Sequence, residues 1–240
     1  MDVPVVLVTG AAHGLGKEVA RQLAAAGRQV VITARDAAQA TRAAGELGPA
    51  VAALPVGLDV SEPASVTIAA QAVAAEPGRL DVLVNNAAAY VDWTETAIGA
   101  DLDAARQVME TNLFGAWRLT QALLPLLRHS SAPRIVNISS GAGSHEDTAF
   151  GLRARGGAAA SYGVSKAALN ALTSTLATEL DGTGILVNAV CPGLTATWPG
   201  AEDMGARPAA DSAPGVVWAA TLPSDGPTGG LFRDCQPLPW

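Results

Sequence analysis

The stretch "VPVVLVTGAAHGLGKEVARQLAAAG" at residues 3–27 joins an apolar run to a helix-compatible run through a turn rich in glycine. Gly10, Gly14 and Gly16 allow positive φ, let the backbone approach a pyrophosphate closely, and aim the N–H groups of the following helix at it. Taken alone, such a triad can also form a tight turn that binds nothing. Because it stands between a strand and a helix, the stretch predicts a nucleotide-binding β–turn–α unit.

The same alternation continues along the chain. Short runs rich in Val and Ile are separated by helix-compatible segments, which favours parallel strands covered on both faces. No repeat or linker divides the chain, so we predict one α/β domain over residues 1–240, a Rossmann-type doubly wound parallel sheet of about seven strands. Residues 195–227 are expected to form a mobile covering loop and a short helix. The apolar runs are 3–9, 29–34, 50–59, 80–86, 134–139, 185–190 and 228–233.

Composition argues against several classes of partner. The 240 residues are 49% hydrophobic and carry a net charge of −7 without a basic cluster, so neither nucleic acid nor a membrane is an expected partner. Met1 leads directly into a short apolar run without a basic leader, which favours a cytoplasmic protein. Cys191 and Cys235 lie far apart, and the three histidines share no ligand spacing, so neither a disulfide nor a metal site is expected.

Further motifs follow in an order that resembles the short-chain dehydrogenase/reductase family. The first turn has the spacing Gly-x3-Gly-x-Gly after Thr9, and the resemblance covers nearly the whole chain. Two departures are Ala88, where the family usually has Gly, and His13, where NADP-dependent members often have Arg or Lys. The resemblance implies an NAD(P)-dependent oxidoreductase. The later motifs are "NNAA" at 85–88, "ETNLFG" at 110–115, "IVNISSGAG" at 135–143, "SYGVSK" at 161–166 and "CPGLTAT" at 191–197.

The catalytic group implied by this resemblance is Ser140, Tyr162, Lys166 and Asn112. Tyr162 exchanges the proton, and Ser140 donates to the substrate carbonyl. The Lys166 ammonium and the cationic nicotinamide should bring the pKa of Tyr162 toward the working range. Ser139 is the fallback for Ser140, and Asn112 holds a water or merely satisfies backbone groups. On their helix alone, a packing Tyr and a solvated Lys are the alternatives. Both stand at the edge of an apolar stripe formed by Leu169, Leu172, Leu176 and Leu180.

The choice of cofactor depends on "VVITARD" at residues 30–36. By resemblance, the acidic position of NAD-dependent members falls on Ala34, and Arg35 follows, so NADP is favoured over NAD. Asp36 superficially favours NAD, but with Gln39 it fits a helix N-cap and capping box. The alternative to a phosphate contact is that Arg35 is an ordinary solvated side chain. By resemblance Asp59 contacts the adenine, and its alternative role is a helix cap.

The expected cofactor-binding residues lie in the turns after the predicted strands and on the catalytic helix. By resemblance, Thr197 is the candidate contact to the nicotinamide carboxamide, with Thr195 as its close competitor. The full set is Thr9, Gly10, His13, Gly14, Leu15, Gly16, Arg35, Asp59, Val60, Asn86, Ala87, Tyr162, Lys166, Pro192, Gly193, Thr195 and Thr197.

Ser140 and Tyr162 stand farther apart than in many family members, because residues 144–160 form an insertion. Such insertions resemble the carbonyl-reductase-like branch, which implies reversible reduction of a ketone or aldehyde. An NAD-dependent alcohol dehydrogenase and a non-enzymatic NADP-binding sensor are the alternatives, and both a homo-oligomer and a monomer fit the sequence. By position, the substrate pocket could include Tyr90, Trp93, His145, Phe150 and Trp198.

Overall fold

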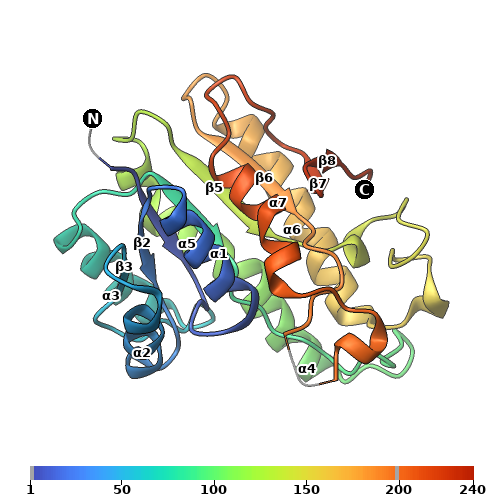
Figure 1. Cartoon of the computed structure of the whole chain (residues 1–240). Coiled ribbons are helices and arrows are strands. Elements are labelled where there is room, and N and C mark those ends of the chain that lie inside the picture. The colour runs from blue at the N-terminus through green and yellow to red at the C-terminus, as the bar shows by residue number, and fades with distance from the viewer. Residues whose placement is uncertain (1–2, 198–199) are drawn as a thin grey trace.

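A single sheet runs through the computed structural model, which describes residues 3–197 and 200–240 and leaves out the side chain of Met204 (Figure 1). Its strands have the order β3-β2-β1-β4-β5-β6-β7-β8, and all pair parallel except β8 with β7. The predicted doubly wound parallel sheet is confirmed, with one short antiparallel strand added at its edge. The strands are β1 Val5–Val8, β2 Gln29–Ile32, β3 Val51–Ala53, β4 Val82–Asn85, β5 Arg134–Ile138, β6 Leu186–Val190, β7 Leu231–Arg233 and β8 Gln236–Pro237.

Helices cover both faces of the sheet (Figure 1). One apolar cluster joins the sheet to α3, α5 and α6, and a second joins it to α1, α2 and α7. The helices are α1 Gly14–Ala25, α2 Ala37–Leu47, α3 Pro63–Ala75, α4 Leu102–Met109, α5 Ala116–Leu127, α6 Ala160–Glu179 and α7 Ala209–Ala220; a π-helical turn, Glu110–Gly115, joins α4 to α5, and short 3-10 turns lie at Gly141–Gly143, Arg155–Gly157 and Glu202–Met204.

Strand β1 shows why the apolar runs lack polar alternation. Val5 and Leu7 pack into the cluster on one face, whereas Val6 and Val8 pack into the cluster on the other. All four side chains are therefore buried, and a polar residue at any of these positions would lose its hydration. The chain leaves β1 toward β2 and β3 and later returns to its other side at β4. This reversal opens a crevice at the carboxyl ends of β1 and β4.

The segment 195–227 holds the predicted helix in a longer form than expected. It contains α7, twelve residues long, which packs against α1 and buries Val216 and Ala219. Pro214 inside this helix cannot donate to the carbonyl one turn earlier. That carbonyl, of Ala210, accepts from Gln22 Nε2 of α1 at 3.1 Å. Proline and small residues hid the helical pattern, while a neighbouring helix supplies the missing donor.

In the described ranges, no helix is both long and apolar enough to cross a membrane.

Candidate active site

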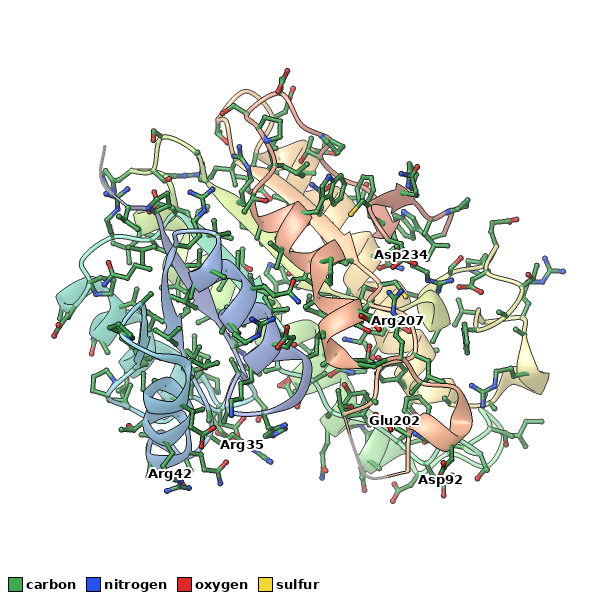
Figure 2. The ribbon with its side chains drawn as sticks, viewed as in Figure 1. Arg35, Arg42, Asp92, Glu202, Arg207 and Asp234 are labelled. Atoms are coloured by element: carbon green, nitrogen blue, oxygen red, sulfur yellow. The ribbon has the colours of Figure 1, made fainter. Side chains whose placement is uncertain are left out.

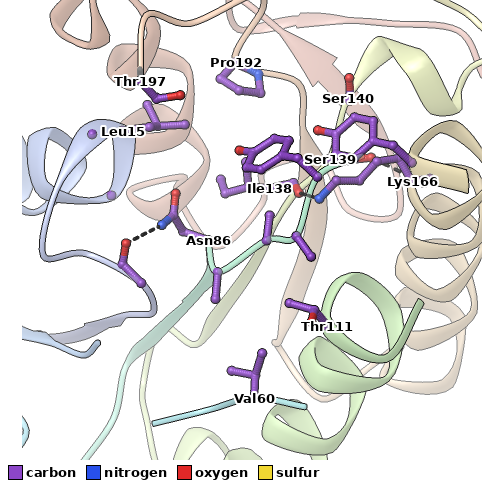
Figure 3. Close-up of a pocket in the computed structure, with 18 of the residues that line it drawn as sticks. Leu15, Val60, Asn86, Thr111, Ile138, Ser139, Ser140, Lys166, Pro192 and Thr197 are labelled. Carbon is purple, nitrogen blue, oxygen red and sulfur yellow. Dashed lines mark hydrogen bonds between the residues drawn. The ribbon is translucent and has the colours of Figure 1, made fainter. Parts of the chain in front are cut away.

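A cavity of about 1490 Å³ lies at the carboxyl ends of β1, β4, β5 and β6 (Figure 3). The turns that follow these strands form its floor, and residues 150–159 reach its rim. Its volume exceeds that of a site for a single drug-sized ligand, so it has room for a dinucleotide and a substrate. Of the predicted cofactor-binding residues, it is lined by Gly10, His13, Gly14, Leu15, Gly16, Arg35, Asp59, Val60, Asn86, Ala87, Tyr162, Lys166, Pro192, Gly193, Thr195 and Thr197.

The glycine turn has the shape that a pyrophosphate requires. Gly10 and Gly14 have φ of 61° and 56°, a backbone region that favours glycine. A Cβ atom on Gly16 would lie 2.4 Å from Asn86 Nδ2. The turn then enters the N-terminus of α1, where free N–H groups favour an anion. The residues present therefore fit an NAD(P) pyrophosphate.

Thr9, predicted to bind cofactor, is buried and is not among the described residues that line the cavity. Its hydroxyl oxygen accepts from the N–H groups of Asn86, at 2.9 Å, and Ala87, at 3.0 Å. Asn86 Nδ2 in turn donates to the Thr9 carbonyl at 2.7 Å, and Figure 3 shows this side chain facing α1. Thr9 thus joins the end of β1 to the turn after β4. It is not itself among the described lining residues but holds in place Asn86 and Ala87, which are.

The turn after β2 carries Arg35, whose exposed side chain has no hydrogen-bond or ion-pair partner among the described residues (Figure 2). The preceding Ala34 is small and buried. Asp36 caps α2, because its carboxylate accepts from the Ala38 N–H at 2.9 Å, which confirms the predicted N-cap. The side chain of Gln39 makes no return bond of a capping box within the described ranges. A cationic group is thus free at the entrance of the predicted adenosine site.

The turn after β3 places Asp59 on the cavity wall. Asp59 Oδ1 accepts from the Ser61 N–H at 3.0 Å and from Ser61 Oγ at 2.6 Å. Glu62, and not Asp59, is the N-cap residue of α3, so the alternative of a helix cap at Asp59 is wrong. Val60 follows Asp59. A Cβ atom on Gly115 would lie 2.7 Å from Val60 Cγ2, so Val60 leaves no room for one.

The turn after β6 closes the cavity opposite the glycine turn. Gly193 has φ of 74°, and the carbonyl of Pro192 accepts from Arg207 Nη2 at 2.7 Å. Arg207 also pairs with Asp234, as Figure 2 shows. Thr195 is buried and donates to Ser212 Oγ at 2.9 Å, whereas Thr197 stands at the cavity opposite Gly14. Of the two competing threonines, Thr197 has the hydroxyl without a partner among the described residues.

Tyr162 and Lys166 lie one turn apart on α6, on the side that faces the sheet. Both are buried, at 7% and 2% exposure. Lys166 Nζ donates to the Ile138 carbonyl at the end of β5, at 2.8 Å, and lies 5.5 Å from the centroid of the Tyr162 ring (Figure 3). Burial lowers the pKa of Lys166 to about 8, so its amine is still mostly protonated at neutral pH.

The pKa of Tyr162 reflects the burial of its phenol. In the protein chain by itself, burial raises this pKa well above its ordinary value, and the hydrogen bond with the Ser140 side chain only partly opposes that effect. Tyr162 is therefore a firmly protonated phenol at neutral pH, the form that a proton donor needs. The shift of this pKa toward the working range, expected from the ammonium together with the cationic nicotinamide, stays a prediction.

Two serines follow β5, and their side chains point differently. The Ser140 side chain lines the cavity with Tyr162 and acts to lower the pKa of that phenol, and its Oγ accepts from the Ala142 N–H at 3.1 Å. The hydroxyl of Ser139 is buried and donates to Asn170 Oδ1 at 2.5 Å. Only Ser140 of this pair therefore presents its hydroxyl to Tyr162.

Asn112 occupies the π-helical turn between α4 and α5 and is buried. Its Oδ1 accepts from the Ala89 N–H at 2.7 Å, and its Nδ2 donates to the Ala89 carbonyl and to Ser165 Oγ, both at 3.0 Å. Its side chain is not in contact with the cavity in the described ranges. Asn112 thus holds the segment after β4 against α6, and a water site beside Lys166 stays a prediction.

Aromatic side chains form the substrate end of the cavity. Tyr90 stacks on the Tyr162 ring with centroids 5.4 Å apart, and Trp93 meets that ring edge-on at 5.5 Å. Phe150, from the insertion, also lines the cavity, as do Arg155, Ala158 and Ala159. His145 is not among the described lining residues, and Trp198 lies outside the described residues.

The insertion is fastened to the end of the sheet by contacts that the sequence does not signal. The Asp147 carboxylate accepts from Arg233 Nη2 of β7 at 2.5 Å and from the N–H groups of Ala149 and Phe150. Ser144 Oγ donates to the Pro239 carbonyl at 2.6 Å, and Figure 1 shows this yellow segment beside the C-terminal strands. Burial raises the pKa of Asp147, but these bonds and Arg233 outweigh it and lower that pKa overall.

Sequence analysis also missed Cys191 as a contact of the catalytic turn. Its sulfur accepts from the Gly141 N–H, directly after Ser140, at 3.1 Å and from Arg233 Nε at 3.3 Å. Within the described ranges, no group of three His, Cys, Asp or Glu side chains could hold a metal ion. The arrangement therefore offers acid–base chemistry beside a dinucleotide site.

Comparison with known proteins agrees with this geometry. The model of the family described as short chain dehydrogenase matches residues 4–204. Among curated proteins, the rhamnolipids biosynthesis 3-oxoacyl-(acyl-carrier-protein) reductase of Pseudomonas aeruginosa is 37% identical over 193 residues, which cover 79% of this chain and 72% of the relative.

Two solved structures are also similar. The NADPH-bound carbonyl reductase from chicken fatty liver has a TM-score of 0.84 and 29% identity, with 100% of both chains covered. The 3-ketoacyl-(acyl-carrier-protein) reductase of Brucella melitensis, complexed with NADH, has a TM-score of 0.83 and 27% identity, with 96% of both chains covered.

Proposed function

The chain belongs to the short-chain dehydrogenase family and is an NAD(P)-dependent oxidoreductase, and on that premise we propose that it reduces the carbonyl of a ketone or aldehyde with NADPH and catalyses the reverse oxidation. One observation carries the proposal: the buried Lys166 amine lies 5.5 Å from the centroid of the Tyr162 ring, and Ser140 lies on the wall of the same cavity. All three residues line one cavity, within the single domain that we propose for residues 1–240.

The bound nicotinamide supplies the hydride for reduction and accepts it for oxidation. Ser140 donates a hydrogen bond to the carbonyl oxygen of the substrate, on which negative charge develops. Tyr162 gives its proton to that oxygen, since burial keeps the phenol protonated at neutral pH. The Lys166 ammonium then stabilises the phenolate that remains. In oxidation, the phenolate accepts the alcohol proton.

The preference for NADPH rests on the turn after β2. Arg35 has no side-chain partner among the described residues and lines the cavity, so its guanidinium is available to a ribose 2′-phosphate. Ala34 offers no carboxylate to repel that phosphate or to bind a 2′-hydroxyl. The two similar structures named above bind NADPH in one case and NADH in the other. The proposal for this chain therefore depends on Arg35 itself.

The test is a spectrophotometric assay of NADPH and NADH oxidation with a panel of ketones, aldehydes and quinones. We expect turnover with NADPH and a lower kcat/KM with NADH. An NADPH-binding protein without turnover on any carbonyl would favour a sensor, and faster turnover with NADH would favour an NAD-dependent alcohol dehydrogenase.

A further inference from the structure

Helix α6 (Ala160–Glu179) begins without a capping side chain of its own. The residue before it, Ala159, has φ of 56° and contributes no side-chain hydrogen bond among the described residues. The first N–H groups of a helix have no partner within the helix. Tyr162 lies in this first turn, so the partners of these N–H groups determine how firmly the phenol is held.

Glu95 supplies the missing partner from a distant part of the chain. Its Oε2 accepts from the Ser161 N–H at 2.8 Å, across 66 positions, and its backbone carbonyl accepts from the Ala160 N–H at 3.4 Å. A carboxylate at this position also interacts favourably with the helix dipole. Glu95 therefore acts as an N-cap that another segment provides.

That segment, residues 86–101, also contacts the catalytic ring. It contains no helix or strand and connects β4 to α4. Tyr90 stacks on Tyr162 with an interplanar angle of 21°, and Trp93 packs against both rings, at 5.9 Å from Tyr90. Asn112 fastens the beginning of the segment through Ala89. Glu95 fastens it beyond the two rings, so the aromatic wall and the catalytic helix are held together at both ends.

We propose that Glu95 is a positioning residue, which caps α6 from the segment 86–101 and thereby fixes Tyr162 against Ser140 and against the Tyr90–Trp93 wall. Its effect on turnover rests on the proposed function, whereas its effect on the placement of the phenol does not. Proton transfer depends steeply on placement, and a displacement of about 1 Å can cost about a hundredfold in rate. Removal of a cap that merely stabilised the fold would lower Tm but would leave the kcat of the folded protein unchanged.

The test compares three variants with a matched control. Glu95→Ala removes the acceptor, and Glu95→Met removes it with less loss of volume; we expect kcat to fall by roughly tenfold or more in each, with the Kd for NADPH within about twofold. Glu95→Gln keeps an acceptor oxygen and should retain kcat within about threefold. The control is Asp101→Ala, because Asp101 caps α4 with a carboxylate at the end of the same segment. It should lower Tm and leave kcat unchanged.

A second readout does not need turnover. Tyr90 and Tyr162 are the two tyrosines of the chain, so Tyr90→Phe leaves Tyr162 as the single phenol, and its ionisation can be followed by near-ultraviolet absorbance. In this background, Glu95→Met should expose the phenol and lower the pH at which it ionises, and Asp101→Ala should not. A shift without turnover in the parent protein would support the positioning role and reject the proposed function. Unchanged kcat and unchanged ionisation in Glu95→Met would overturn the inference.

Discussion

The two halves of the cavity are built by different means. In the nucleotide half, the turns that directly follow the strands form the wall, and Gly10, Gly14 and Gly16 leave room for a ligand. In the substrate half, two irregular segments form the wall. Each is fastened by a carboxylate to a distant element: Glu95 to the start of α6, and Asp147 to Arg233 of β7.

This difference separates the parts of the cavity wall whose side chains can be exchanged from those whose side chains cannot. A side chain added to the glycine turn meets neighbouring atoms directly, so the nucleotide half is restricted to one class of cofactor. In the substrate half, the rings of Tyr90, Trp93 and Phe150 line the cavity, whereas Glu95 and Asp147 are not among its described lining residues. We therefore expect exchange of these rings to change substrate choice while the two carboxylate anchors remain.

Gly16→Ala should break the nucleotide half of the cavity. The added Cβ would lie 2.4 Å from Asn86 Nδ2 and 3.0 Å from the Gly10 carbonyl. Overpacking of this kind costs about 1–3 kcal/mol, so the Kd for NADPH should rise by about tenfold to a hundredfold. Isothermal titration calorimetry measures it. Gly45→Ala is the control, since a Cβ there meets no atom within 4 Å; equal loss of affinity in both variants would refute the steric explanation.

The corresponding change in the substrate half is Asp147→Ala. It removes the acceptor of Arg233 Nη2 and of two backbone N–H groups at a carboxylate that is 4% exposed. The free energy of unfolding should fall by roughly 2–4 kcal/mol, with NADPH affinity nearly unchanged. Urea denaturation measures the loss. Asp103→Ala breaks an exposed pair with Arg106 and should cause no measurable change; an equally small effect at Asp147 would show that the insertion is not fastened there.

Lys166 predicts a dependence of stability on pH. Its pKa is about 8 in the folded protein and near 10.5 when unfolded, so between these values the unfolded chain binds more protons. The free energy of unfolding of the wild type, relative to Lys166→Met, should therefore rise with pH from about 8 to 10.5, by up to about 3 kcal/mol. Denaturation curves at several pH values measure the difference. A constant or falling difference would mean that the amine is not held in the buried, desolvated site.

Arg35→Ala tests which group in the nucleotide half selects the cofactor. Loss of one charge-assisted contact to a 2′-phosphate costs about 1.5–3 kcal/mol, so the Kd for NADPH should rise by roughly tenfold to a hundredfold. The Kd for NADH should stay the same, because NADH lacks that phosphate. Equal affinity of the variant and the wild type for NADPH would show that Arg35 does not select the cofactor.

The features that could be predicted from the sequence belong mainly to the nucleotide half of the cavity, and those that could not belong mainly to the substrate half. The sheet and the glycine turn could be predicted because their signals are local: apolar runs, and glycines at a strand–helix junction. A helix was expected within 195–227, but the full length of α7 was not, because Pro214 suggests a break and the carbonyl that it leaves without a donor is satisfied by Gln22 of another helix. Glu95, Asp147 and Arg233 carry no local signal, since their roles arise from contacts between distant positions. The upward effect of burial on the pKa of Tyr162 could not be predicted from the sequence, because the burial of one side chain depends on the whole fold.

The central claim is that Tyr162 transfers the proton during NADPH-dependent reduction of a carbonyl. Steady-state turnover and NADPH affinity of Tyr162→Phe, measured on the same preparation, test it most directly. Removal of a general acid typically costs about 10²–10⁴-fold in rate, so we expect kcat to fall within or beyond that range while the Kd for NADPH stays within a few-fold. Retained turnover in Tyr162→Phe would contradict the account.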